Sequence, residues 1–245
     1  IERLKIPEVR NAPSIKKFRE FGMISLENGG GISFKAGSPL EIAGSLLGVE
    51  VMLKWMMKES CSLHKLLRIS TDYLKSIAKY YIKEFGAEKC SAFIPLPLES
   101  NTLISEKMFK EYSLTYLQEI IYNLIRLGIK RFHIHLCGDH SNNLKYWLSD
   151  IKIPERTIFS LGKEMDIFKV SKILGEKHII AGNISTSLLC IASPKEIYEE
   201  TREVVIKMKN RPGGFILMPE CGLSPHTPPI NLHAMIKAGK DFGYL

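Results

Sequence analysis

Short apolar segments alternate along this chain with longer segments in which apolar residues recur at every third or fourth position. The short segments are GISFKAG near residue 31, KCSAFIPL near 89, RFHIHLCGD at 131, RTIFSLG near 156, KHIIAGNI near 177 and GFILMPE at 214. Each is bounded by glycine, proline or charged residues, which is typical of buried strands. The alternation predicts about six β/α units, the sequence pattern of a parallel sheet covered by helices.

The longer segments predict amphipathic helices between these strands. Apolar residues keep helical spacing between Leu63 and Ile77, and again between Met108 and Leu124. A third helix has a clear start at SPKE, because Ser193 can cap it, the following proline fits its first turn, and Glu196 completes a capping box.

Such an α/β order fits either an open doubly wound sheet or a closed (β/α)8 TIM barrel. No G-x-G-x-x-G dinucleotide motif follows any of the strands, which favours the barrel. Because a barrel closes with eight strands, we expect its first strands to lie upstream of Ile1. We therefore expect residues 1–245 to form a single barrel domain that is the C-terminal fragment of a longer chain.

Composition places the chain among ordinary globular proteins. Apolar residues make up 45% of it and charged residues 24%. There is no apolar run long enough to cross a bilayer and no signal-peptide pattern at the start. The cysteines number five and are widely spread, which fits free thiols or metal ligands in a reducing compartment. We expect a cytoplasmic protein.

The charge pattern argues against two classes of partner. The net charge is +8, but the lysines occur mostly singly on the polar faces of the predicted helices. Dense basic clusters interleaved with aromatic residues, typical of nucleic-acid binding, do not occur. We expect neither nucleic acid nor a membrane as a partner.

Candidate metal ligands lie in the strand at 131–139. His135 and Cys137 share one face of this strand, since side chains alternate between faces, while Phe132, Ile134 and Leu136 face the covering helices. In a barrel the first face points to the axis, and its last members lie at the carboxyl-terminal mouth, where barrel active sites form. A buried structural cysteine beside a core histidine would give the same pattern.

Cys221 is the best candidate for a third ligand, because it follows the last predicted strand and would reach the same rim of a barrel. One nitrogen and two thiolates favour zinc over magnesium or calcium. Three protein ligands leave a fourth position for substrate, which is typical of catalytic zinc, and zinc can hold a thiol as a nucleophilic thiolate.

Several stretches resemble the uroporphyrinogen decarboxylase superfamily. They are HIHLCGDHSNNLKYW, AGNIS at 181–185, ESNTLISEKMFKEYSLTYLQEII at 99–121 and GGFILMPECGLSPHTPPINLHAMIKA. Within it the chain is more similar to the cobalamin-dependent methyltransferases, whose zinc site is H-x-C followed by a distant cysteine. The true decarboxylases lack cysteines at positions 137 and 221, which disfavours decarboxylation.

The resemblance implies methyl transfer between a corrinoid protein and an acceptor. The cofactors would be Zn²⁺, held by His135, Cys137 and Cys221, and methylcobalamin carried by the partner protein. The acceptor would be a small thiol, similar to coenzyme M or homocysteine, or a pterin such as tetrahydrofolate.

Three further residues are expected to shape the acceptor pocket as catalytic residues: Glu99, Asp139 and Asn183. A solvated loop charge is the alternative for Glu99, and a capping amide is the alternative for Asn183. Glu164 or Asp166 could complete the zinc shell or hydrogen-bond the other nitrogen of His135, although Asp166 could simply cap the next helix.

Other functions remain open. A uroporphyrinogen decarboxylase would need no metal, and neither would methyl transfer from methyltetrahydrofolate to a corrinoid protein in the same barrel. A non-catalytic fragment that only binds the corrinoid protein would show binding without turnover. Metal content separates the zinc mechanism from the two metal-free reactions.

Overall fold

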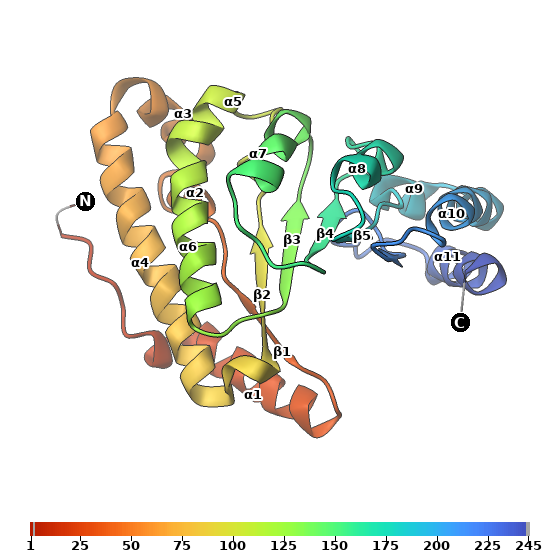
Figure 1. The fold of residues 1–245 in the computed structure, drawn as a ribbon, viewed down its shortest axis with the longest axis horizontal. Coiled ribbons are helices and arrows are strands. Elements are labelled where there is room, and N and C mark those ends of the chain that lie inside the picture. The colour runs from red at the N-terminus through yellow and green to blue at the C-terminus, as the bar shows by residue number, and fades with distance from the viewer. Residues whose placement is uncertain (2, 244–245) are drawn as a thin grey trace.

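The computed structural model describes residue 1 and residues 3–243 of the chain. Its centre is a sheet of six parallel strands in which every strand pairs with the next one along the sequence. Figure 1 shows the strands side by side with the helices packed around them. The six predicted strands are confirmed as β1 (Ile32–Lys35), β2 (Cys90–Pro95), β3 (Phe132–Leu136), β4 (Ile158–Leu161), β5 (Ile179–Ala181) and β6 (Phe215–Ile216).

Helices connect each pair of consecutive strands, as the α/β prediction requires. The described α-helices are α1 (Pro13–Glu27), α2 (Pro39–Leu47), α3 (Val49–Lys58), α4 (Ser60–Phe85), α5 (Glu106–Phe109), α6 (Thr115–Arg126), α7 (Leu144–Ser149), α8 (Ile167–Ile173), α9 (Thr186–Ile191), α10 (Pro194–Met208) and α11 (Pro229–Phe242). Short 3₁₀ turns cover Val9–Asn11, Ala87–Lys89 and Ser141–Asn143, and a π-helical turn, Lys110–Leu114, joins α5 to α6.

The predicted helix starts and faces are confirmed where they were specific. At α10, Ser193 accepts a hydrogen bond from the backbone of Glu196 while the Glu196 carboxylate accepts one from the backbone of Ser193. The apolar residues between Leu63 and Ile77 all lie in α4, and most of them are fully buried.

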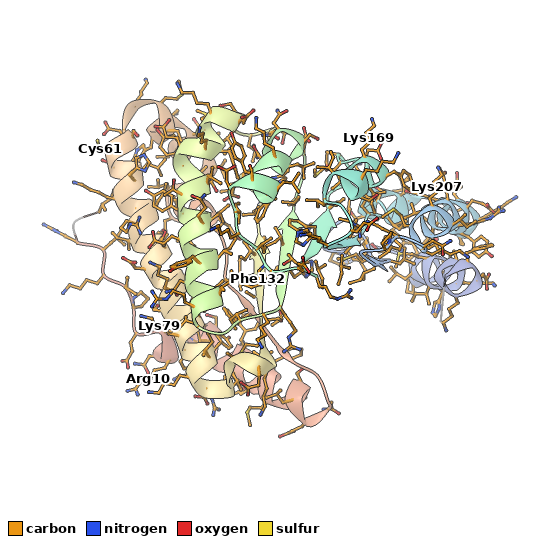
Figure 2. The ribbon with its side chains drawn as sticks, in the orientation of Figure 1. Arg10, Cys61, Lys79, Phe132, Lys169 and Lys207 are labelled. Atoms are coloured by element: carbon orange, nitrogen blue, oxygen red, sulfur yellow. The ribbon has the colours of Figure 1, made fainter. Side chains whose placement is uncertain are left out.

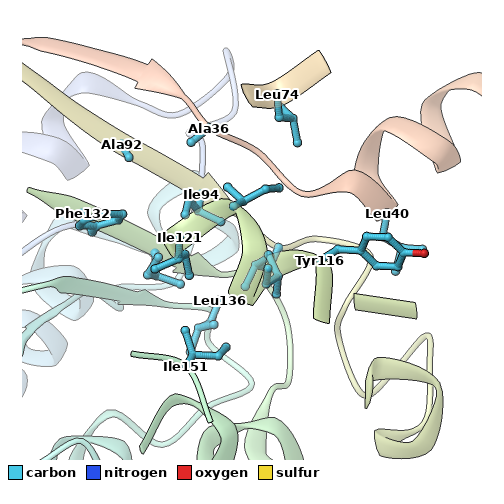
Figure 3. Packing of buried hydrophobic residues seen from close by; sticks show 14 of the residues in the cluster. Ala36, Leu40, Leu74, Ala92, Ile94, Tyr116, Ile121, Phe132, Leu136 and Ile151 are labelled. Carbon is cyan, nitrogen blue, oxygen red and sulfur yellow. The ribbon is translucent and has the colours of Figure 1, made fainter. Parts of the chain in front are cut away.

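The main core lies between the sheet and α4 and α6. The apolar face of β3 is buried in it, with Phe132 exposed by 2% and Leu136 by 0%. Figure 3 shows Ile94 of β2, Ile121 of α6 and Leu136 of β3 gathered in this layer. Burying one face of β3 in this way leaves its other face, which carries His135, for the inside of the sheet.

The edge strands of the described sheet are β1 and β6. Among the described residues β1 pairs only with β2, and β6 pairs only with β5. The α/β class with sequential parallel strands is as predicted. Closure into an eight-stranded (β/α)8 barrel stays a prediction, as does the division of the chain into a single domain.

Charged side chains lie on the outside of the helices, as their spacing predicts. Lys79, Lys169 and Lys207 all point away from the fold (Figure 2). Lys169 and Lys207 pair with acidic residues of their own helix segment. In the part of the chain that the structure describes, no helix is long and apolar enough to span a membrane.

Candidate metal centre

The structure brings the three predicted metal ligands together. One potential ligand atom from each of His135, Cys137 and Cys221 lies within 4.8 Å of the other two. Within the described ranges, no other set of three or more histidine, cysteine or acidic side chains is close enough to hold an ion. His135 is buried, Cys137 is half-buried and Cys221 is exposed, so the cluster lies at the rim of the sheet.

Cys221 reaches this place because the chain after β6 keeps running alongside the segment that follows β5. The amide of Ile184 donates to the carbonyl of Met218 at 3.3 Å, and the amide of Glu220 donates back to the carbonyl of Ile184 at 2.9 Å. Two hydrogen bonds therefore fix the backbone immediately before Cys221.

The buried carboxylate of Glu220 adds further links at the same point. It accepts hydrogen bonds from the amide of Lys163 at 2.8 Å and from the amide and hydroxyl of Thr186 at 2.9 and 3.0 Å. These bonds join the loop after β4, the start of α9 and the residue next to Cys221. A single side chain thus links three segments at the rim of the sheet.

His135 is oriented by the neighbouring strand. In the β3–β4 register His135 lies opposite Ser160, and its Nδ1 is 2.9 Å from the Ser160 hydroxyl oxygen. The same hydroxyl is 2.7 Å from Nε2 of His133. With Nδ1 of His135 engaged, its Nε2 is the nitrogen left for a metal. Burial lowers the pKa of His135, which favours the neutral ring that a metal ligand must be.

The two thiols differ in what they need before they can bind a metal. Burial, reinforced by the neighbouring Cys221, raises the pKa of the Cys137 thiol to about 11. Cys137 is therefore protonated at neutral pH in the metal-free protein. A cation must displace this proton, because the thiolate is the form that coordinates.

A cavity of about 280 Å³ opens beside the two cysteines. Its wall includes Ser100, Thr102, Glu164 and Glu220, with Leu103 as an exposed apolar side chain on the rim. No lysine or arginine lines this cavity in the described part of the chain. Its size suits a small molecule.

Glu99 lies next to this wall but is itself fully buried, so it is not a solvated loop charge. One carboxylate oxygen, Oε1, accepts hydrogen bonds from the hydroxyls of Ser38 and Ser113, and Oε2 has no partner among the described residues. Burial raises the pKa of Glu99 to about 7. The structure does not bring Glu99 into the group formed by His135 and the two cysteines.

Asp139 and Asn183 both hydrogen-bond nearby backbone. The Asp139 carboxylate accepts from the amide and hydroxyl of Ser141, at 2.9 and 2.6 Å. The Asn183 amide donates to the carbonyls of Gly162 and Met165, at 3.1 and 3.0 Å, and faces a different cavity from Cys137. Their proposed catalytic roles stay predictions, and these contacts favour a structural task for both.

The remaining candidates separate clearly. Asp166 caps α8 by accepting from the amides of its first turn, as its alternative interpretation predicts. Glu164 lines the cavity beside Cys137.

Ser160, which orients His135, and Glu220, which links the segments around Cys221, were not predicted from the sequence. Ser160 could have been found, because the period-two alternation of β4 puts it on the inward face opposite His135. Glu220 was not recognisable, because nothing in the sequence says which backbone amides its carboxylate will meet.

The uroporphyrinogen decarboxylase (URO-D) family profile matches residues 14–242, which is nearly the whole chain. This chain belongs to the URO-D family. Family membership agrees with the alternating α/β fold and with the resemblance seen in the strand-end motifs. It does not by itself choose between the family's reactions.

The curated relatives of this chain include methyltransferases. The methylated-thiol–coenzyme M methyltransferase of Methanosarcina mazei is 27% identical over 205 residues, covering 83% of this chain and 51% of the relative. Methylcobamide:CoM methyltransferase MtaA of Methanosarcina barkeri is 25% identical over 244 residues, covering 99% and 66%. Curated uroporphyrinogen decarboxylases also match, one of them over 73% of this chain.

A solved structure supports the fold. A methyltransferase from Methanosarcina mazei superposes with a TM-score of 0.78 at 22% identity, covering 98% of this chain and 68% of the other. At this identity the likeness shows the fold alone. The chain spans about half to two thirds of the length of the two methyltransferases described above.

Proposed function

We propose that this chain transfers a methyl group between a corrinoid carried by a partner protein and a small thiol, at a zinc site formed by His135, Cys137 and Cys221. The observation that carries the proposal is the meeting of one nitrogen and two sulfurs within 4.8 Å beside a cavity. Relatives named for coenzyme M and methylcobamide chemistry support both the thiol and the corrinoid.

The donor set fits zinc. Zinc takes nitrogen and thiolate ligands at about 2.0 to 2.3 Å, and ligand atoms already within 4.8 Å need only small side-chain rotations to meet one ion. Three protein ligands leave one position, and the cavity beside the cysteines supplies the space for an acceptor. When bound, zinc would lower the pKa of the acceptor thiol so that it reacts as a thiolate.

The residues of this chain then have distinct tasks. His135, Cys137 and Cys221 hold the cation, and the chain reaches the correct geometry through the hydrogen bonds of Ser160 and Glu220. The exposed Thr102 hydroxyl on the cavity wall can hydrogen-bond the polar end of an acceptor, and the buried Ser100 hydroxyl holds Thr102 in place. Glu164 is placed on the same wall to accept the proton that a thiol acceptor releases.

Decarboxylation of a porphyrinogen is the alternative reaction within the family. The cavity wall argues against it, because it carries Glu164 and Glu220 and no lysine or arginine among the described residues. A substrate with many carboxylates would be repelled by such a wall. A small thiol with a single anionic group meets less of this repulsion than a substrate with many carboxylates.

Zinc content tests the proposal. Elemental analysis of protein purified without chelator should give about one zinc per chain in the wild type. Cys137→Ala and Cys221→Ala should each lose it, whereas the matched control Cys190→Ala, a half-buried thiol on α9, should keep it. Zinc-loaded protein should then demethylate methylcobalamin with a small thiol as acceptor. Absence of zinc from the wild type would overturn the mechanism and favour a metal-free pterin reaction or a fragment that only binds the corrinoid protein.

A further inference from the structure

We propose that Ser160 is a positioning residue of the metal site. Its hydroxyl accepts a hydrogen bond from Nδ1 of His135 and also bonds Nε2 of His133, and this fixes the His135 ring so that Nε2 faces the cation. The inference rests on the proposed function, since it concerns the same three ligands.

The direction of these hydrogen bonds follows from the number of protons available. The Ser160 hydroxyl oxygen lies 2.9 Å from Nδ1 of His135 and 2.7 Å from Nε2 of His133, so it bridges two rings. A hydroxyl has one proton and can donate to only one of them. The other ring must therefore donate to the hydroxyl oxygen.

A metal on His135 requires that His135 be the donor to the Ser160 hydroxyl. If Ser160 donated to Nδ1 of His135, a neutral His135 would carry its proton on Nε2 and could not use that nitrogen as a ligand. If His135 donates from Nδ1 instead, its Nε2 lone pair is free, whether the hydroxyl donates to Nε2 of His133 or accepts from it as well. The cation and the hydroxyl therefore select the same tautomer of His135.

The surroundings hold both rings in place. Ser160 is exposed by only 1%, so water does not compete for its hydroxyl. On the other side, the Phe93 ring of β2 lies 5.0 Å from the His133 ring and 6.5 Å from the His135 ring, measured between centroids. The β3–β4 register places the serine opposite the ligand histidine, so the contact is built from strand pairing rather than from a mobile loop.

Zinc affinity measured by competition with a chromophoric chelator tests this role. Ser160→Ala should weaken zinc binding roughly 10- to 100-fold, the range found when the hydrogen-bond partner of a ligand histidine is removed. His133→Phe should have a smaller effect, because His135 keeps its own bond to the hydroxyl. Ser70→Ala removes a hydroxyl with 2% exposure that bonds only within α4, and should leave the affinity unchanged.

Two spectroscopic measurements report on the coordination itself, and the first of them needs no variant. In ¹⁵N-histidine NMR spectra of the zinc-loaded wild type, His135 should be protonated at Nδ1 and bound to the cation through Nε2. In the cobalt-substituted protein, Ser160→Ala should also shift the d–d absorption bands, which a general loss of stability would not do.

The possible failures are distinguishable. If the wild type binds no zinc, the proposed function itself fails. If the wild type binds zinc through the cysteines but Ser160→Ala binds it equally well, or His135 coordinates through Nδ1, the metal site stands and the role of Ser160 is overturned.

Discussion

Replacing Glu99 by glutamine should change how the stability of this protein depends on pH. Glu99 is fully buried, and burial raises the pKa of its carboxyl to about 7. In the unfolded chain a glutamate has its ordinary pKa of about 4.3. Because the folded pKa is the higher one, the folded protein holds a proton that the unfolded chain releases between these values. The stabilisation that the protonated Glu99 carboxyl contributes is therefore fully present below about pH 4 and is lost as the pH rises through 7.

The size of the effect follows from these two pKa values. Integrating the difference in bound protons between pH 5 and pH 8 gives a loss of about 2.5 kcal/mol in the free energy of unfolding. Glutamine keeps an oxygen for the hydroxyls of Ser38 and Ser113 but has no charge to bury. With a urea slope of about 3 kcal/mol per molar, the wild-type midpoint should fall by about 0.8 M more than that of Glu99→Gln.

Urea unfolding of both proteins at pH 5 and pH 8, followed by circular dichroism, measures this difference. Glu20→Gln is a suitable control, because it makes the same chemical change on the exposed surface of α1. The control should follow the wild type at both pH values. If Glu99→Gln and wild type lose stability in parallel between pH 5 and pH 8, Glu99 is already ionised in the folded protein and the burial argument is wrong.

Three other predictions follow from the rim of the sheet and from the core. Burial raises the pKa of the Cys137 thiol to about 11, so zinc must displace its proton. Apparent zinc affinity, measured by chelator competition, should therefore increase at least about tenfold per pH unit from pH 6.5 to 8.5. A flat profile would contradict this. Glu220→Ala leaves the amides of Lys163 and Thr186 without their acceptor. It should lower the free energy of unfolding by about 2 kcal/mol in urea titrations. The control Glu203→Ala, on the exposed face of α10, should leave it unchanged. Burial also raises the pKa of the Cys90 thiol to about 11, above its value in the unfolded chain. The stability that the protonated thiol contributes is therefore complete below about pH 8.5, and the free energy of unfolding should fall by about 2 to 3 kcal/mol by pH 10.5. Cys90→Ala should remove that part of the alkaline loss in urea titrations.

The strands and main helices could be predicted because their signals are local. Each strand is a short apolar run ended by glycine, proline or charge, and the α10 start is encoded within four residues, Ser193 to Glu196. The π-helical turn at Lys110–Leu114 was not predicted, because it interrupts apolar residues that keep helical spacing on both sides. Its existence depends on packing that periodicity does not report.

The candidate site was predictable only in part, for a related reason. Alternation along β3 put His135 and Cys137 on one face, and the end of β6 suggested Cys221. The burial of Glu99 was missed because it is set by the serines of two other segments, Ser38 and Ser113, which sequence distance does not connect. Contacts between loops need the three-dimensional arrangement before they can be identified.

The meeting of the ligands also says something about the sheet itself. Two strands, β4 and β5, separate β3 from β6, so in a flat sheet the ends of β3 and β6 would be about 14 Å apart at a spacing of about 4.8 Å per strand. Side chains on a flat sheet stand parallel to one another and do not close such a distance. A concave inward face, the curvature of a barrel wall, would shorten this distance, and the segment after β6 carries Cys221 the rest of the way to within 4.8 Å of the other ligands. The metal site then depends on the strand pairing between β3 and β6 as much as on the three ligands, and changes that loosen β4 or β5 should weaken zinc binding without touching a ligand.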